Sequence, residues 1–139
     1  MYIGEFQHNM DDKNRVFIPA KLRETLGERF VVCNGVGDFL TLYSVEEWEK
    51  FEAKINALPQ MESHDLKTFF FSGANEVKPD AQGRVVIPQN LKQHANLTRE
   101  LVITGASNRA EIWNAEAWHE RKSAISIQSI KEKMALFGL

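Results

Sequence analysis

Two short segments of the sequence carry an aspartate four residues before an arginine. The pairs are Asp11 with Arg15 and Asp80 with Arg84, and the residues around them match at a constant offset (84 − 15 = 69). An aspartate in a turn accepts hydrogen bonds from the backbone N–H groups of that turn. An arginine at the start of the following strand presents a fork of N–H donors, which suits a phosphate or the acceptor edge of guanine. The spacing therefore predicts an anion or nucleic-acid contact, in which the aspartates position the turns and the arginines reach outward.

Four further residues at matching places are candidates for supporting contacts. Lys13 adds a positive charge beside the first arginine, and Gln82 is its neutral counterpart in the second copy. Arg23 and Lys92 occupy matching places on two short predicted helices, where each adds a second cation. An alternative stays open, in which each Asp–Arg pair only stabilises its own turn. Exposed ion pairs contribute only about 0–1 kcal/mol, so stability alone is a weak reason for two copies.

The repeat extends well beyond the two turns. Leu22 falls on Leu91, and later segments match after a small insertion. We predict a first module at residues 1–58, a linker helix at 59–72 and a second module at 73–139 with a long C-terminal helix. Two similar modules present the same side chains from two places, which suits a binding surface better than a single catalytic pocket.

Each module is predicted to contain strand, turn, strand, short helix, two strands and a helix. The elements expected in the first half are a strand from Tyr2 toward a turn at Asn9–Asn14, a strand at Val16–Ile18, a helix at Ala20–Leu26, strands at Phe30–Cys33 and Phe39–Tyr43, and a helix after the Ser44 cap. Those expected in the second half are a helix at Leu66–Phe71, a strand before Pro79, a turn at Asp80–Gly83, and then a strand at Arg84–Ile87, a helix at Gln89–Ala95, and strands at Leu101–Thr104 and Ala110–Trp113. A last helix is predicted to run from the cap at Asn114 almost to the end, and Pro59–Ser63 is predicted to interrupt the helical pattern between the halves.

Two hydrophobic features have competing interpretations. Phe69, Phe70 and Phe71 cannot all point inward from one helix, so we expect partial burial between neighbouring subunits, with burial in the chain's own core as the alternative. Cys33 lies in an apolar strand and is expected to be a buried thiol, the alternative being a nucleophile.

Composition excludes several classes of function. The formal net charge is −2, so bulk charge gives no support for nucleic-acid binding and the claim must rest on local placement. One cysteine permits no internal disulfide, and the four histidines show no metal-ligand spacing, so no metal and no cofactor are expected. No catalytic residues can be assigned, and an enzyme is not predicted. The N-terminus lacks the pattern of a signal peptide, and no apolar stretch approaches the roughly 20 residues of a membrane span, so a cytoplasmic protein is expected.

The unit Asp-x-x-Gly-Arg-Val-x-Ile-Pro-x-x-Leu-Arg/Lys resembles the swapped-hairpin DNA-binding module of the AbrB/SpoVT type. Two tandem copies in one chain, the second following Phe69–Ala74, resemble the MraZ family of bacterial transcriptional regulators, and the resemblance covers nearly the whole sequence. It implies an α+β fold in which two pseudo-symmetric β-α-β swapped-hairpin half-units form an AbrB-like β-barrel with flanking helices. The family's signature pairs fall here on Asp11 with Arg15 and on Asp80 with Arg84.

The resemblance also implies partners. The chain is expected to form a homo-oligomer, a closed ring, and to bind double-stranded DNA at direct repeats in the promoter of its own division and cell-wall gene cluster. It would act there as a regulator, usually a repressor, associated with the nucleoid. The sequence departs from the family pattern at Asn14, where glycine is usual, and at Gln82 and Lys92, where lysine and arginine are common. The competing hypothesis is an oligomeric interaction scaffold that uses the Asp–Arg pairs for assembly.

Overall fold

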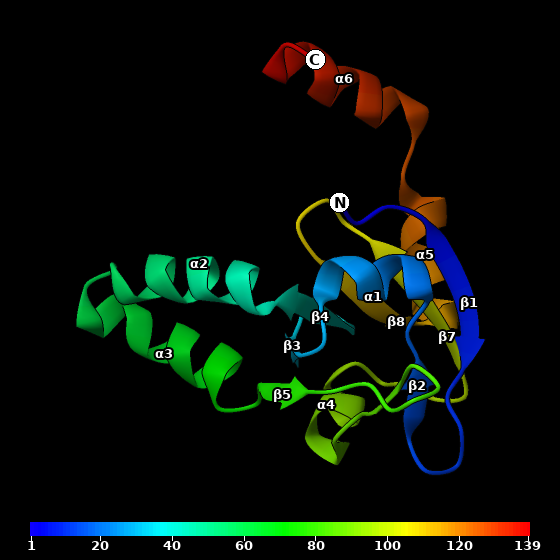
Figure 1. Ribbon diagram of the computed structural model, residues 1–139. Coiled ribbons are helices and arrows are strands. Elements are labelled where there is room, and N and C mark those ends of the chain that lie inside the picture. Colours follow the sequence, from blue (N-terminus) through cyan, green and yellow to red (C-terminus); the bar gives the residue numbers. More distant parts are fainter.

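The structure, a computed structural model, describes residues 1–139 and contains eight strands and six helices (Figure 1). In chain order these are β1 (Glu5–Asn9), β2 (Arg15–Phe17), α1 (Ala20–Leu26), β3 (Phe30–Asn34), β4 (Phe39–Ser44), α2 (Val45–Asn56), α3 (Gln60–Phe71), β5 (Asn75–Val77), β6 (Arg84–Val86), α4 (Gln89–His94), β7 (Glu100–Gly105), β8 (Ala110–Asn114), α5 (Ala115–Ala124) and α6 (Ile127–Phe137). The mixture of helices with antiparallel strands confirms the predicted α+β class. None of the six helices combines the length and the apolar character that crossing a membrane requires.

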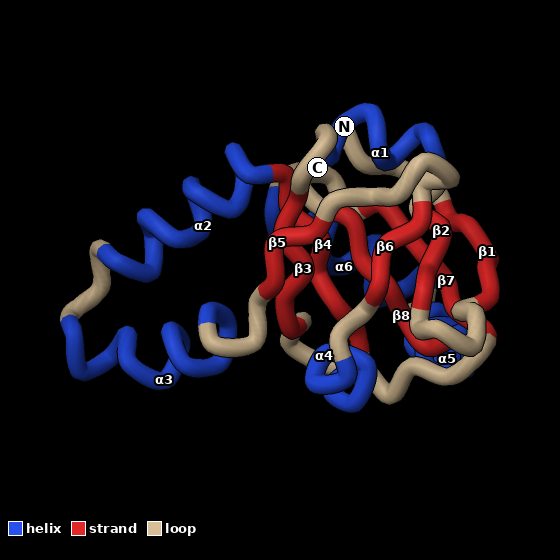
Figure 2. Tube along the Cα trace, turned by 60° about the horizontal axis from the view of Figure 1, so that its bottom comes forward, coloured by secondary structure: helices blue, strands red, loops and turns tan.

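The strands form two separate sheets. Six of them make an antiparallel sheet in the order β1-β7-β8-β4-β3-β5, and β2 pairs with β6 in a two-stranded ribbon (Figure 2). Because β1 and β5 are the two edges of the larger sheet, its pairings do not close it into the predicted barrel.

Four of the six strand pairings join the two halves of the sequence, and only β3–β4 and β7–β8 lie within one half. β1 pairs with β7, β5 with β3, β4 with β8, and β2 with β6, so each of these pairs joins one half to the other. In the ribbon, Val16 lies opposite Val85, its counterpart in the repeat. The backbone bonds beside the ribbon show the same symmetry, since Ile18 N–H donates to the Gly83 carbonyl at 2.9 Å and Ile87 N–H donates to the Asn14 carbonyl at 2.8 Å. The two halves are therefore interleaved about an approximate twofold axis.

The core lies between the ribbon, the inner face of the sheet and the short helices α1 and α4. Most of its members are aliphatic side chains that alternate along the strands or project from one helix face, as burial on one face requires. The largest fully buried side chains are Phe30, Ile18, Leu22, Leu26, Leu40, Leu42, Ile87, Leu91, Leu101, Ile103, Ile112 and Val16. Both copies of the repeat contribute to this one core, which fixes the turns before β2 and β6 relative to each other.

Helices α2 and α3 form a hairpin that projects from the body (Figure 1). The predicted interruption at Pro59–Ser63 is wrong beyond its first residue, because Pro59 is the N-cap and the helix begins at Gln60. Proline suits this position since a helix start leaves its N–H groups without intrahelical partners. The backbone N–H of Ser63 already donates to the Pro59 carbonyl at 2.9 Å.

The three consecutive phenylalanines of α3 each have an aromatic neighbour in the same chain. Phe70 meets Phe51 edge-on with ring centroids 4.9 Å apart, and Phe71 meets Trp48 at 5.5 Å. Phe69 is partly exposed and lies edge-on to His94 at 5.6 Å. The Phe70 and Phe71 contacts hold the hairpin together, and the Phe69 contact joins it to α4. The subunit contact expected for the phenylalanines stays a prediction.

The predicted single C-terminal helix is wrong, because the structure has two helices there. Ile125 is extended (φ −76°, ψ 118°) and ends α5, and Ser126 caps α6 by accepting a hydrogen bond from the Ser129 N–H at 3.0 Å. A serine with its hydroxyl on the N–H three residues ahead is a typical helix start. This local signal overrides the apolar pattern that runs through both helices.

Candidate nucleic-acid interface

The first Asp–Arg turn is a closed hydrogen-bonded loop. Oδ1 of Asp11 accepts from the backbone N–H groups of Lys13 (3.0 Å) and Arg15 (2.9 Å), and Oδ2 accepts from Arg15 Nε at 2.6 Å. Asn14 adopts φ 57°, the left-handed conformation that asparagine tolerates better than most residues. The Asp11 carboxylate therefore bonds both to the backbone of the turn and to the guanidinium.

The second turn repeats this geometry. Oδ1 of Asp80 accepts from the N–H groups of Gln82 and Arg84, both at 2.9 Å, and Oδ2 accepts from Arg84 Nε, also at 2.9 Å. Gly83 takes the left-handed position with φ 82°. Two sequences that differ at three of the five turn positions thus build the same local structure, because the aspartate makes the same bonds in each.

Both aspartates are held in their charged form. The backbone N–H of Arg15 lowers the pKa of the Asp11 carboxyl, and the Arg15 side chain lowers it further. The backbone N–H of Arg84 lowers the pKa of Asp80 in the same way, again with help from the side chain. Hydrogen bonds to a carboxylate favour its ionised state, so both pairs are ionic at neutral pH.

Each arginine keeps most of its donors available. The intramolecular bond uses Nε alone, and no hydrogen bond within the chain engages the Nη atoms of Arg15 or Arg84. A guanidinium has five N–H donors, so four remain on each side chain. The two side chains are 29% and 30% exposed. They are neither sealed in the core nor saturated, which leaves them able to meet an acceptor from outside.

The ribbon presents both arginines on one face. Val16 and Val85 face the core, so Arg15, Phe17, Arg84 and Val86 share the opposite face. Arg15 is paired with Val86 and Arg84 with Phe17, which makes the arginines diagonal neighbours about 7–8 Å apart at Cα. One small outward surface therefore carries both signature side chains.

The helix cations Arg23 and Lys92 each contact the opposite half. Arg23 Nε donates to the Ile18 carbonyl at 2.7 Å and its guanidinium packs against Gly83. Lys92 Nζ donates to Oδ1 of Asn14 at 2.9 Å. The structure thus places both cations beside the turns, where they brace the ribbon between the two halves.

Lys13 and Gln82 are exposed at the tips of the turns, and their side chains make no hydrogen bond within the chain. Only their backbone N–H groups take part in the turns. Their exposed side chains add polar surface at the two turns.

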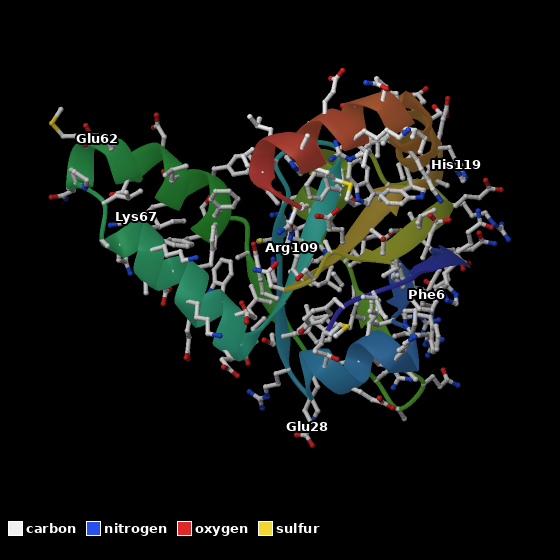
Figure 3. The ribbon with its side chains drawn as sticks, turned by 90° about the horizontal axis from the view of Figure 1, so that it is seen from above. Phe6, Glu28, Glu62, Lys67, Arg109 and His119 are labelled. Atoms are coloured by element: carbon white, nitrogen blue, oxygen red, sulfur yellow. The ribbon has the colours of Figure 1, made fainter.

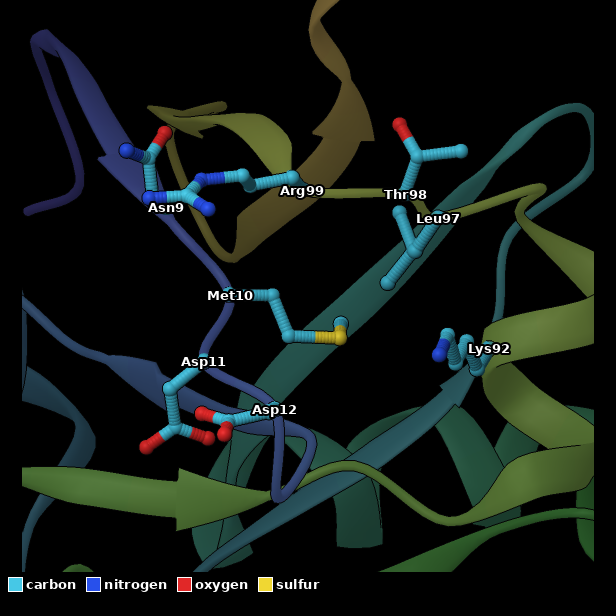
Figure 4. A pocket seen from close by; sticks show the side chains of 8 residues that line it. All are labelled: Asn9, Met10, Asp11, Asp12, Lys92, Leu97, Thr98 and Arg99. Atoms are coloured by element: carbon cyan, nitrogen blue, oxygen red, sulfur yellow. The ribbon is translucent and has the colours of Figure 1, made fainter.

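An open groove of about 730 Å³ flanks the first turn (Figure 4). It is lined by Asn9, Met10, Asp11, Asp12, Lys92, Leu97, Thr98 and Arg99. A second groove of about 580 Å³ flanks the other turn, and its lining is Ala20, Arg23, Glu24, Gly27, Glu28, Lys78, Pro79 and Asp80. Since Asn9–Asp12 and Lys78–Ala81 correspond in the repeat, the two grooves are related by the same approximate symmetry.

Sequence reasoning missed two cations at these grooves, Arg99 and Lys78. Neither has a basic counterpart, because Asn9 matches Lys78 and, after the insertion, Glu28 matches Arg99. A search for repeated residues passes over such positions. The adjacency of Arg99 to the first turn comes from pairing, since its carbonyl accepts from the Met10 N–H at 2.7 Å.

No group of three or more His, Cys, Asp or Glu side chains lies close enough together to hold a metal ion. Cys33 is buried, as expected from its apolar strand, and burial raises the pKa of its thiol to about 12.

The fold and the site define a class of protein: a mixed α+β chain, internally duplicated and interleaved, that presents two aspartate-held arginines on one open ribbon. The family described as "MraZ protein, putative antitoxin-like" matches residues 1–68 and again residues 70–138. The chain belongs to this MraZ family.

Relatives support the same assignment over the full length. The chain is 44% identical to proteins named "Transcriptional regulator MraZ" from Clostridium tetani (over 142 residues), Acetivibrio thermocellus (144 residues) and Heliobacterium modesticaldum (143 residues). In each case the similarity covers 100% of both chains.

Proposed function

We propose that the chain is a sequence-specific DNA-binding transcriptional regulator that acts without catalysis or cofactor. It binds double-stranded DNA at direct repeats in the promoter of its own division and cell-wall gene cluster, in the nucleoid of the cytoplasm, and represses transcription there. The observation that carries the proposal is the pair of aspartate-held arginines on one face of the β2–β6 ribbon. The names of its relatives, transcriptional regulators, agree with it.

A two-stranded ribbon with free guanidinium donors suits the reading of DNA. The major groove of B-DNA is about 12 Å wide and admits a two-stranded β-ribbon. A guanidinium held by its Nε keeps its Nη groups for a bidentate contact with guanine, the commonest specific arginine contact in that groove. Arg15 and Arg84 would make these contacts, while Lys13, Arg23, Gln82 and Lys92 would contribute phosphate or supporting contacts at the edges.

The proposed architecture consists of two AbrB-like swapped-hairpin modules, residues 1–58 and 73–139, joined by the helix at 59–72. Pairing of β2 with β6 supports the swapped arrangement, because it joins the two corresponding strands of the repeat. Several such chains form a closed ring. A ring that places its arginines on one surface reconciles DNA binding with a net charge of −2, and several modest contacts to repeated sites add up through avidity.

The test is a gel-shift and footprint on the DNA immediately upstream of the chain's own gene. In the variant Arg15→Ala plus Arg84→Ala, the loss of each arginine–guanine contact should lower the affinity for this DNA by roughly 5- to 150-fold, the equivalent of about 1–3 kcal/mol. The matched control, Lys54→Ala plus Arg121→Ala, removes two cations away from the ribbon and should bind normally. For each phosphate contact, the logarithm of the binding constant should fall by about 0.9 when the salt concentration rises tenfold.

The scaffold hypothesis gives a different result in the same experiment. If the Asp–Arg pairs served assembly, the double arginine variant would lose its oligomeric state in a sizing column. Unchanged binding of the promoter fragment by an intact oligomer of that variant would refute the assignment of the DNA site.

A further inference from the structure

The C-terminal helix α6 has an apolar face that nothing in its own chain covers. None of its residues is buried. Ile127, Ile130, Met134 and Phe137 recur at helical spacing and are between 40% and 72% exposed. At 100° per residue these four fall on one stripe of the helix. An amphipathic helix is stable when such a stripe packs against another surface, so this stripe needs a partner.

Two lysines border the apolar stripe. The helical period places Lys131 on one side of it and Lys133 on the other, while Leu136 falls on the opposite face. A surface that receives this helix should therefore be apolar along its floor and acidic at its edges.

The body of the molecule has a groove of that description beside α2. Its volume is about 470 Å³, and its lining is Val31, Val45, Trp48, Glu49, Glu52, Phe71, Ala74, Asn75 and Glu76. The apolar members come from β3, α2, the end of α3 and the loop residue Ala74 that follows it. Glu49, Glu52 and Glu76 carry the negative charge of the groove. The groove thus matches the helix in both polarity and charge.

The connection of α6 keeps it away from the groove of its own chain. Only Ile125 and Ser126 join it to α5, and two residues span at most about 7 Å. α5 packs against β7 and β8, whereas the groove lies at the β3–β5 edge of the sheet. α6 lies above the sheet at the top of Figure 1, and the hairpin, which bears Glu62 and Lys67 (Figure 3), projects from the side of the body at a lower level.

We propose that α6 of one copy docks in the Val45–Trp48–Phe71 groove of a second copy, with Lys131 and Lys133 facing its glutamates. Each copy then offers one helix and one groove, which is a head-to-tail contact. Such contacts close into a ring when the rotation between copies permits it. The inference deepens the proposed function, since it rests on that proposal for the ring and assigns the surfaces that build it.

The first test removes the apolar stripe. Ile130→Glu plus Met134→Glu should convert the oligomer to monomer in size-exclusion chromatography with light scattering. Leu136→Glu is the matched control, because it places one charge on the opposite face of the same helix and should leave the mass unchanged. A stripe variant that keeps the mass of the native oligomer, or a native chain that is monomeric, would overturn the proposal.

A charge exchange tests the pairing itself and leaves the apolar stripe intact. Glu49→Lys plus Glu52→Lys gives a basic groove, and Lys131→Glu plus Lys133→Glu gives an acidic helix. Each variant alone should dissociate, because its own helix and groove then repel. Mixing the two should restore the oligomer, since each groove now meets the other chain's helix. Assembly of the groove variant alone would instead indicate a symmetric α6–α6 contact, and failure of the mixture to assemble would exclude this groove.

DNA binding separates this inference from the proposed function. The dissociated stripe variant should bind a fragment with one repeat as the native protomer does and lose the gain in affinity that several repeats provide. If the stripe variant keeps the native mass and binds DNA normally, the docking proposal alone is overturned. If the stripe variant dissociates as expected but the native oligomer binds no promoter DNA, the proposed function alone is overturned.

Discussion

The guanidinium of Arg23 lies directly over Gly83, in the turn that belongs to the other half of the chain. A Cβ atom at Gly83 would stand 2.7 Å from Arg23 Cζ and 2.9 Å from its Nε, which already donates to the Ile18 carbonyl. The symmetric contact is built differently, because Lys92 donates to the side chain of Asn14. The larger cation, Arg23, therefore lies against the turn that has glycine at its left-handed position. The slimmer cation, Lys92, contacts the turn that has asparagine there.

This complementarity predicts that the two contacts are exchangeable only as pairs. Gly83→Asn alone should destabilise the fold, because the new side chain displaces Arg23 from Ile18. The left-handed backbone adds up to roughly 1–2 kcal/mol for an ordinary residue and less for asparagine. Combining Gly83→Asn with Arg23→Lys should recover part of the loss, with a coupling of about 0.5–3 kcal/mol in chemical denaturation.

The control for this cycle is Gly83→Asn with Lys21→Arg, which alters a cation on the same helix that takes no part in the contact. It should show no coupling. Additivity of Gly83→Asn and Arg23→Lys within about 0.5 kcal/mol would mean that the contact between them carries no specific energy.

The ionised aspartates predict a defined pH dependence. Their folded pKa values lie below the ordinary aspartate value of about 3.9, so their stabilising contribution is complete above that value and is lost as pH falls through the lowered folded pKa. Asp11→Asn plus Asp80→Asn keeps the acceptors for the backbone but removes the charge-assisted bonds to the arginines. The difference in melting temperature between native chain and variant should be constant from about pH 6 to 8 and shrink below about pH 4.

The same variant should bind promoter DNA more weakly than the native chain and more strongly than the double arginine variant, because the arginines remain but are no longer held. A gel-shift at neutral pH measures this order. Native affinity in the aspartate variant would show that the turns need no anionic anchor.

The turns could be predicted from sequence because every interaction that builds them spans at most four residues. The spacing of Asp11 and Arg15, and its recurrence at Asp80 and Arg84, contains the whole geometry. The contact of Lys92 with Asn14 could not be predicted, because it depends on how the halves interleave. A repeat reveals which residues correspond and not which of them meet.

The boundary between α5 and α6 is set by a local helix cap, which the apolar pattern does not reveal. The stripe that continues from Trp118 to Phe137 predicts one helix, but the hydroxyl of Ser126 starts a new one. The open sheet could not be predicted either, because it depends on which distant strands pair. The predicted barrel and the observed strand order use the same strand segments.

Cys33 should be inert toward thiol reagents in the folded chain. Burial raises the pKa of its thiol to about 12, so the thiolate fraction at pH 8 is about 10⁻⁴, a thousandfold or more below that of an ordinary cysteine. A chromogenic disulfide reagent at pH 8 should release its coloured thiolate slowly from reaction with the folded chain and at once when the chain is in denaturant. Absorbance measures this release. Rapid reaction of the native chain would place the thiol at the surface.

The interleaved strands predict that the two halves unfold together. Leu22 and Leu91 are counterparts in the repeat and are 1% and 0% exposed in one core. Leu22→Ala and Leu91→Ala should each cost about 2–5 kcal/mol, and each should shift the same single transition, because a domain with one core unfolds as a unit. A fragment of residues 1–72 should be unfolded by circular dichroism, since β1 and β3 lose their partners β7 and β5. Two separate calorimetric transitions, or a folded fragment, would show that each half has a core of its own.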